Sequence, residues 1–306
     1  NDDIATVTAN HFGDLSRKES YGELWGLSVH PTDANVFATV AEDKTVRVWD
    51  IAAKKTTLRV AVGEKGKTVN YSPDGKYLAV GFDNGSLALY HAADLSELAS
   101  VRKHKREIQV VRFSPDSSMV ALGCADQTVD LYKLTDDGDL KRVEKLTGAS
   151  SRILHVDFTE DGKYVRVCTQ AYELLYFETE TGKFFGKCKE IRDVKYASES
   201  SILSWNSQGI WPPEADGSDI NAVNVSQSKK FLVSAEDSGL VKVFNFPTVG
   251  GGLNKKGKLV RRPASVSSLA HAEHVTKVEF NADDSRVVST GGADNAVMVW
   301  KFNKTA

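Results

Sequence analysis

The chain has 306 residues, of which 41 % are hydrophobic and 26 % charged, a composition typical of a globular protein rather than a disordered or fibrous one. Its 39 Lys and Arg residues nearly balance 41 Asp and Glu residues, and this net charge of −2 argues against a nucleic-acid partner. No apolar run approaches the roughly 20 residues of a membrane-spanning helix, so we expect no membrane partner.

The chain begins at Asn1 rather than Met and shows no secretory signal, so we expect a fragment of a longer cytoplasmic protein. Three scattered cysteines are too few for a disulfide framework or a zinc site, and the odd count is typical of a reducing compartment. The first predicted element is a short strand over residues 4–8, which precedes the first copy of a repeat.

A repeat of about 42 residues fills the rest of the chain. Each copy has an apolar strand, a step of small residues, an acidic turn and an alternating strand that ends in an aromatic residue. In FATVAEDKTVRVWD, VALGCADQTVDLYK and VVSTGGADNAVMVWK, the turn residues Asp43, Asp126 and Asp294 stand six positions before that aromatic. The period is typical of a four-stranded propeller blade. The closing aromatics of the seven copies are Trp49, Tyr90, Tyr132, Phe177, Trp211, Phe244 and Trp300.

Seven copies predict an all-β, seven-bladed WD-repeat β-propeller that spans residues 1–306 as a single domain. The chain ends soon after the third strand of the last copy, so residues 4–8 are expected to add its outer strand and close the ring. The copy that ends at Trp211 is followed by two prolines and is expected to form a three-stranded blade. Residues 250–268 are expected to be an insertion loop.

Two histidines recur with the blade rather than with any catalytic pattern. His104 precedes Asp126 by 22 residues and His271 precedes Asp294 by 23, so each imidazole can reach the Asp in the turn between the middle strands. A catalytic dyad is the alternative, but a catalytic site occurs once and no nucleophile elbow accompanies these pairs. We therefore predict structural His–Asp pairs, with Asp43 as a structural turn residue of the same kind.

No residue pattern predicts an enzyme, a cofactor or a metal site. The segment AVGEKGKT (residues 61–68) is similar to a phosphate-binding loop, but a strand pattern follows it where that loop needs a helix N-terminus. The remaining histidines show no metal-ligand spacing with cysteines or carboxylates.

Two sets of residues are candidates for contact with a protein partner. The insertion carries basic residues and no acidic ones, so it is either a solvated loop or a contact for an acidic partner. These basic residues are Lys255, Lys256, Lys258, Arg261 and Arg262. The second set lies in the loops that a propeller presents on its top face, where a peptide can be held. These loops lie near Glu23, Arg106, Arg152, Asp219 and Glu273.

Several stretches resemble a known family. The strands VRVWD and VMVWK and the turn GGAD resemble WD repeats in general. A more specific stretch, QGIWPPEADGSDINAVNVSQSKKFLVSAEDSGLVKVFNFP (residues 208–247), resembles the echinoderm microtubule-associated protein-like family. ELWGLSVHP (23–31), AYELLYF (171–177) and HAEHVTKVEFNADDSRVVSTGGAD (271–294) are similar to the same family, in the C-terminal propeller of its tandem propeller region.

This resemblance implies binding to tubulin or microtubules without catalysis, and a cytoskeletal location in the cytoplasm. It also implies that the propeller packs against another propeller in the full-length protein. Since tubulin has acidic tails, the basic insertion is the expected contact. The alternative is a general WD-repeat scaffold that binds a peptide or protein partner unrelated to tubulin.

Overall fold

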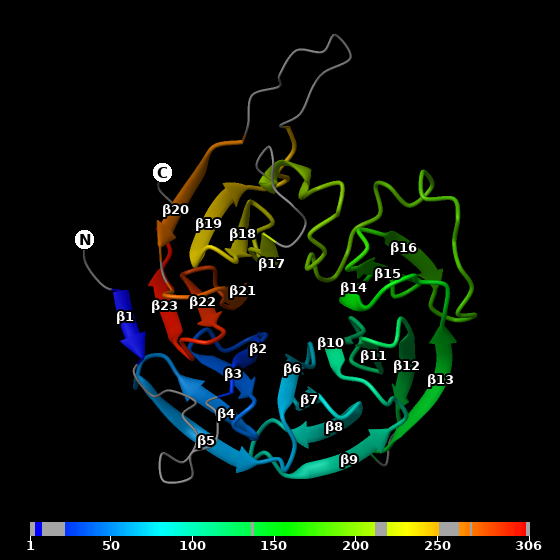
Figure 1. The fold of residues 1–306 in the computed structure, drawn as a ribbon, viewed down its shortest axis with the longest axis horizontal. Coiled ribbons are helices and arrows are strands. Elements are labelled where there is room, and N and C mark those ends of the chain that lie inside the picture. Colours follow the sequence, from blue (N-terminus) through cyan, green and yellow to red (C-terminus); the bar gives the residue numbers. More distant parts are fainter. Residues whose placement is uncertain are drawn as a thin grey trace.

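Six antiparallel sheets stand radially around a central channel in a computed structural model of the chain (Figure 1). The structure describes residues 4–7, 22–135, 138–211, 219–250, 263–269 and 271–303, with 4–7 known from their backbone only. Within these ranges, none of the helical segments has the length and apolar character needed to cross a bilayer. The prediction of an all-β propeller is therefore confirmed.

Each sheet starts with a strand beside the channel and continues outward in chain order, except that the N-terminal strand forms the outer strand of the last sheet. The first three sheets have four strands each: β2 (Leu24–Val29), β3 (Val36–Ala41), β4 (Thr45–Asp50) and β5 (Lys55–Ala61); β6 (Gly66–Tyr71), β7 (Tyr77–Phe82), β8 (Ser86–His91) and β9 (Glu97–Arg102); β10 (Ile108–Phe113), β11 (Met119–Cys124), β12 (Val129–Leu134) and β13 (Leu140–Leu146).

The other three sheets differ in how they are completed. They contain β14 (Ile153–Phe158), β15 (Tyr164–Thr169) and β16 (Leu174–Glu178); β17 (Ile220–Val225), β18 (Phe231–Glu236), β19 (Leu240–Asn245) and β20 (Ser265–Leu269); β21 (Val275–Phe280), β22 (Arg286–Gly291), β23 (Val297–Lys301) and β1 (Ile4–Val7).

The ring is closed by its two ends. Strand β1 pairs antiparallel with β23, with Ile4 opposite Trp300 and Val7 opposite Val297. The N-terminal strand therefore gives the last blade its fourth, outer strand (Figure 1). This confirms the predicted closure, which pairs the edge that β23 would otherwise expose.

The core lies between adjacent blades, where the two faces of every middle strand are covered. Strands β3, β7, β11, β15, β18 and β22 are almost entirely buried, which explains their continuous apolar runs. The outer strand β5 alternates between exposed and half-buried residues, whereas the outer strand β20 is exposed throughout. The turns between first and second strands are fixed by hydroxyl groups: Ser72 Oγ accepts from Tyr77 N–H at 2.9 Å, and Ser114 Oγ accepts from Met119 N–H at 2.9 Å.

The prediction of seven blades is wrong, because the described residues form six sheets. The copy that ends at Trp211 contains no strand and no three-stranded blade; its only regular element is a short 3₁₀-helix, η2 (Gln208–Ile210). Residues 179–211, which follow β16, instead form turns and loops between two sheets (Figure 1). Ile202 and Ile210 pack there against Cys168 of β15 and Ile220 of β17.

Side-chain hydrogen bonds hold this strandless segment in place. The N–H groups of Ser200 and Ser201 donate to the carboxylate of Asp157, at 3.0 and 3.1 Å. Ser207 Oγ donates to the carbonyl oxygens of Ser201 and Ser204, both at 3.2 Å. Short polar side chains thus satisfy backbone groups of this segment.

Two further expectations about the edges of blades are corrected. The three-stranded sheet is the one formed by β14, β15 and β16, whose outer edge carries only an isolated bridge from Phe177 to Phe184. Residues 265–268, expected in the insertion loop, belong to β20, which pairs with β19. Residues 251–262 of that expected loop lie outside the described part of the chain.

Candidate binding site at the mouth of the central channel

Each of the six inner strands has a β-bulge one residue after its start. The pairing of β2 with β3 skips Trp25, and the pairing of β6 with β7 skips Lys67. A bulge adds one residue to a strand and re-aims its side chain. The six skipped residues are Trp25, Lys67, Gln109, Leu154, Asn221 and Thr276. All six line one cavity of about 480 Å³, which we call the mouth cavity.

The mouth cavity opens on the top face, which we define as the face where the six inner strands begin. Apolar groups form one part of its wall: Leu154, Ile202, Ile220 and Tyr172, of which Tyr172 is 58 % exposed. An acidic and a basic side chain, Glu42 and Lys67, contact the ring of Trp25. Its Nε1–H donates to Glu42 Oε1 at 3.1 Å, and Lys67 Nζ lies 4.4 Å from the centre of the ring.

Basic groups form the deeper part of the cavity. Lys277 and His155 line it one position further along their strands than Thr276 and Leu154. Burial and the charge of Arg112 lower the pKa of Lys277 to about 8, and nearby carboxylates offset only part of this effect. Burial and the charge of Lys277 likewise lower the pKa of His155 to about 3, so its imidazole is neutral at pH 7.

Below this layer, the fifth residue of each inner strand joins neighbouring parts of the ring. Ser28 Oγ accepts from Tyr71 N–H at 3.0 Å and Asn70 Oδ1 accepts from Phe113 N–H at 3.1 Å, each 43 residues further along. The other acceptor–donor pairs are Asn224 with Phe280, Glu279 with Val29 and Asp157 with Ser200. The Asp157 pair also spans 43 residues, so Ser200 lies where the inner strand of a seventh blade would run.

Arg112 holds the sixth of these positions and interrupts the pattern. A guanidinium has five N–H donors and no acceptor, so it cannot accept a backbone N–H as the others do. Its Nε is buried and has no hydrogen-bond partner among the described residues. The side chain therefore contributes a positive charge to the channel beneath Lys277.

Asp157 lies at the centre of a buried ionic network. Its Oδ2 is 2.7 Å from Arg166, which also binds Glu199 at 2.8 Å. Burial would raise the pKa of Asp157, but the charges of Arg166 and Arg112 and the hydrogen bond from Ser198 Oγ lower it to about 2. The same carboxylates raise the pKa of Arg166 against the effect of its burial. The network fixes the strandless segment to β14 and β15.

The structure brings both predicted His–Asp pairs together. His104 Nδ1 lies 2.7 Å from Asp126 Oδ2, and His271 Nδ1 lies 3.1 Å from Asp294 Oδ2. His104 Nε2 also lies 3.3 Å from Asp130 Oδ2, an ionic contact without hydrogen-bond alignment. Burial would lower the pKa of His104, but Asp130, Cys124 and Asp126 raise it to about 10.

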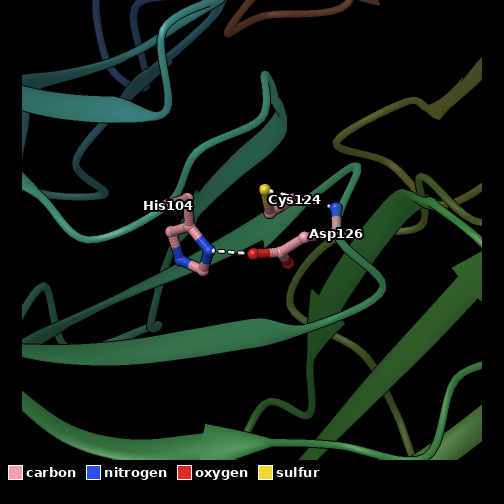
Figure 2. Close-up of side chains that lie close together, drawn as sticks. All are labelled: His104, Cys124 and Asp126. Carbon is pink, nitrogen blue, oxygen red and sulfur yellow. Dashed lines mark hydrogen bonds and ion pairs between the residues drawn. The ribbon is translucent and has the colours of Figure 1, made fainter.

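His104, Cys124 and Asp126 offer three atoms within 4.8 Å of one another, the one grouping among the described residues with a metal-like donor set (Figure 2). Their contacts have a simpler explanation. Cys124 Sγ accepts from Asp126 N–H at 3.4 Å while the carboxylate binds His104. In the last blade, Gly291 stands at the position of Cys124, and the His–Asp pair is still present. The pair therefore does not depend on a thiolate ligand.

The last blade extends its pair into a chain of hydrogen bonds. His271 Nε2 lies 2.9 Å from Ser289 Oγ, which accepts from Trp300 Nε1–H at 3.0 Å. The first blade repeats the inner half of this chain, since Trp49 Nε1–H donates to Thr39 Oγ1 at 2.7 Å. Asp43 fixes the corresponding turn by accepting from Thr45 N–H at 3.0 Å and binding Arg47 at 2.8 Å.

Of the five residues expected on the top face, one lines the mouth cavity. Arg152 lies on its wall and pairs with Glu107 at 3.4 Å. Arg106 and Glu273 are exposed on the loops before β10 and β21, outside the cavity lining. Glu23 and Asp219 accept backbone N–H groups through their carbonyl oxygens. Lys255, Lys256, Lys258, Arg261 and Arg262 lie outside the described residues.

Sequence reasoning missed Trp25, Lys277 and Arg112. A signal for Arg112 was present, because a polar residue recurs at the fifth position of every otherwise apolar inner strand, as in IQVVRF and ILHVDF. No comparable signal marks the bulged positions, whose residues range from Trp25 to Thr276.

The radial sheets, the ring closure and the repeated turns define a WD-repeat β-propeller. Comparison with known proteins identifies the family within this class. Residues 24–302 match a family model described as the echinoderm microtubule-associated protein second beta-propeller, and the chain belongs to that family.

Similar proteins carry the name of this family. Echinoderm microtubule-associated protein-like 2 from Mus musculus is 34 % identical over 282 residues, which are 91 % of this chain and 41 % of that protein. The 77 kDa echinoderm microtubule-associated protein from Strongylocentrotus purpuratus is 31 % identical over 91 % of this chain and 39 % of its own length. The chain thus spans about two fifths of these relatives.

A solved structure, the crystal structure of the mitotic checkpoint complex, contains a chain with the same fold. The TM-score is 0.67 at 13 % identity, over 92 % of this chain and 87 % of that chain. At this identity the likeness concerns the fold alone.

Proposed function

We propose that this chain is a non-catalytic, protein-binding propeller that binds tubulin or microtubules as part of a longer microtubule-associated protein. The observation that carries the proposal is the match of residues 24–302 to the second propeller of that family. Relatives that align over 91 % of the chain are named microtubule-associated proteins. A cytoskeletal location in the cytoplasm and packing against another propeller belong to the same proposal.

The polar clusters of the structure support a binding role rather than catalysis. The His–Asp pairs and the Asp157 network bind backbone groups and each other inside the blades. The phosphate-loop-like segment leads into strand β6 (Gly66–Tyr71), which does not provide the helix N-terminus that binds phosphate.

Co-sedimentation with stabilised microtubules and capture of soluble tubulin test the proposal directly. We expect saturable binding of the purified chain in at least one of the two assays. Absence of binding in both, for a chain with a cooperative melting transition, would refute tubulin binding by this propeller.

The basic stretch remains the predicted contact for acidic tubulin tails. Replacing Lys255, Lys256, Lys258, Arg261 and Arg262 by Glu is expected to weaken tubulin binding and to remove much of its salt dependence. Each exposed ion pair contributes about 0–1 kcal/mol, so the five together contribute at most about 5 kcal/mol, and a loss of about 1.4 kcal/mol lowers affinity tenfold. Unchanged affinity and an unchanged salt dependence would show that these five residues do not contact tubulin.

A second candidate function is a general scaffold that holds a peptide unrelated to tubulin. The mouth cavity favours it, since its volume of about 480 Å³ lies within the usual range for ligand sites. A partner screen that yields a saturable ligand, while both tubulin assays stay negative, would select this alternative.

A further inference from the structure

Two basic side chains in the central channel lie near carboxylates but make no direct ion pair among the described residues. Among the residues that the structure describes, neither Lys277 Nζ nor the Arg112 guanidinium forms an ion pair or a side-chain hydrogen bond, and Arg112 Nε is buried without a partner. Buried or half-buried cations are normally paired. The unpaired charges lie at and below the floor of the mouth cavity, which opens to solvent at the top face.

The nearby acids do not neutralise these charges. Asp157 already binds Arg166 and accepts from Ser198, Ser200 and Ser201. Glu279, on the same strand as Lys277, accepts from Val29 N–H at 2.8 Å, and burial raises its pKa, which favours the uncharged form.

One further acid, Asp237, lines the cavity; it is exposed, and its Oδ1 accepts from Asn221 Nδ2–H at 2.6 Å. Strands β2 and β17, which flank β21, present the neutral side chains of Trp25 and Asn221. His155 on β14 is neutral at pH 7. Lys67 on β6 is paired with Glu42 at 2.5 Å, and Arg152 with Glu107. Among the described residues, Lys277 and Arg112 therefore remain without an ion pair, while the carboxylate of Asp237 lies on the exposed part of the same lining.

We propose that the mouth cavity binds the carboxylate of an acidic peptide segment, with that carboxylate on Lys277 Nζ above Arg112 and the peptide against Trp25 and Tyr172. The inference rests on the proposed protein-binding function and names the chemistry of the segment that is bound. Cavity volume and lining suit a few residues of peptide: aromatic and apolar groups lie beside the amide side chain of Gln109, which can pair with a peptide backbone.

A carboxylate fits this site better than a phosphate group. A phosphate monoester carries a charge near −2 at pH 7 and prefers clustered guanidinium groups. Here Lys277 is the one lysine of the described lining without a salt bridge, and the carboxylate of Asp157 lies nearby to repel a second negative charge. A singly charged carboxylate balances Lys277 and adds no second charge near Asp157.

Binding should also change the protonation of Lys277. Its pKa of about 8 leaves a fraction of the amine neutral at pH 8.5, and an adjacent carboxylate favours the charged form. The complex should therefore take up protons at pH 8.5 and few at pH 6.5. Calorimetry in two buffers of different ionisation enthalpy measures this uptake.

Fluorescein-labelled octapeptides of alternating Glu and Gly, with an amidated C-terminus, provide the probe for the full chain. The same peptide with Gln in place of Glu is the charge control, and a Gln peptide with a free C-terminus separates a terminal carboxylate from a side-chain one. We expect saturable anisotropy changes with the Glu peptide. Lys277→Met should weaken its binding about 10- to 100-fold, the loss of one charge-assisted hydrogen bond.

Lys163→Met is the matched control, because Lys163 lies in the turn between β14 and β15, on the opposite face, with its side chain 73 % exposed. It should leave the affinity unchanged. Lys277→Met removes a charge that the fold disfavours, so both variants should melt like the parent chain; Lys277→Gln serves as a second variant if Met alters folding.

Equal binding of the Glu and amidated Gln peptides, or equal affinity of the parent and Lys277→Met chains, would overturn the inference. Displacement of the Glu peptide by inorganic phosphate at lower concentration than by acetate would overturn the choice of carboxylate. If the chain sediments with microtubules but does not bind the Glu peptide, this inference is refuted and the proposed tubulin binding is not. A chain that binds the Glu peptide through Lys277 but neither microtubules nor tubulin upholds it and refutes the proposed tubulin binding.

Discussion

Asp157→Ala should loosen the strandless segment and destabilise the whole ring. The substitution leaves buried Arg166 with Glu199 as its remaining acidic partner and leaves the N–H groups of Ser200 and Ser201 without their acceptor. Breaking a buried ion pair by removing one partner typically destabilises a protein by about 3–5 kcal/mol. Since a domain is stable by about 5–15 kcal/mol in total, the effect should be readily measured.

An independent magnitude follows from the pKa of Asp157. Its value of about 2 in the folded chain lies below the ordinary 3.8, a difference that corresponds to about 2 kcal/mol. Because the folded pKa is the lower one, this stabilisation is complete above about pH 4 and is lost as the pH falls towards 2. The truncation should exceed this value, because it also leaves hydrogen-bond donors unpaired.

Guanidinium chloride unfolding at pH 7 and amide hydrogen exchange provide the assays. The Asp157→Ala chain should lose about 3–5 kcal/mol of unfolding free energy and protection across residues 197–211. Asp193→Ala is the control, since Asp193 is an exposed carboxylate in the same segment. If Asp157→Ala loses less than about 1 kcal/mol and keeps its protection in residues 197–211, the assigned role of the network is wrong.

Three further predictions concern the His–Asp pairs. Asp126→Ala should lower the melting temperature, because it removes the 2.7 Å bond to His104 and an acceptor for Thr128 Oγ1; an unchanged melting temperature would argue against a structural role for the pair. The raised pKa of His104 stabilises the fold fully below about pH 6.5, so unfolding free energy should fall as the pH rises towards 10, and less steeply in Asp126→Ala. Parallel titrations of the two chains would contradict this. Gly291→Ala should be strongly destabilising in a thermal melt, since its Cβ would overlap Asp294 and His271, whereas Gly186→Ala, whose Cβ meets only Phe184 at 3.4 Å, should melt like the parent; equal melting temperatures would refute the close approach.

Local patterns in the sequence were sufficient for much of the fold. Alternating apolar residues, acidic turns and closing aromatics predicted the strands, and the spacing of His104 to Asp126 predicted their contact. The spare strand at residues 4–7 predicted the ring closure. The strands and the His–Asp contact depend on residues close in the chain. The ring closure follows from comparing the last copy of the repeat with the others.

The tertiary structure alone decided the missing blade and the mouth cavity. The copy that ends at Trp211 forms no strand, although Ser200 keeps the contact to Asp157, 43 residues earlier, that inner strands make elsewhere in the ring. The cavity forms because six bulges, each ordinary within its own strand, aim their side chains at one axis. Both the missing blade and the cavity depend on contacts between residues that are far apart in the chain. A local sequence pattern does not specify these contacts.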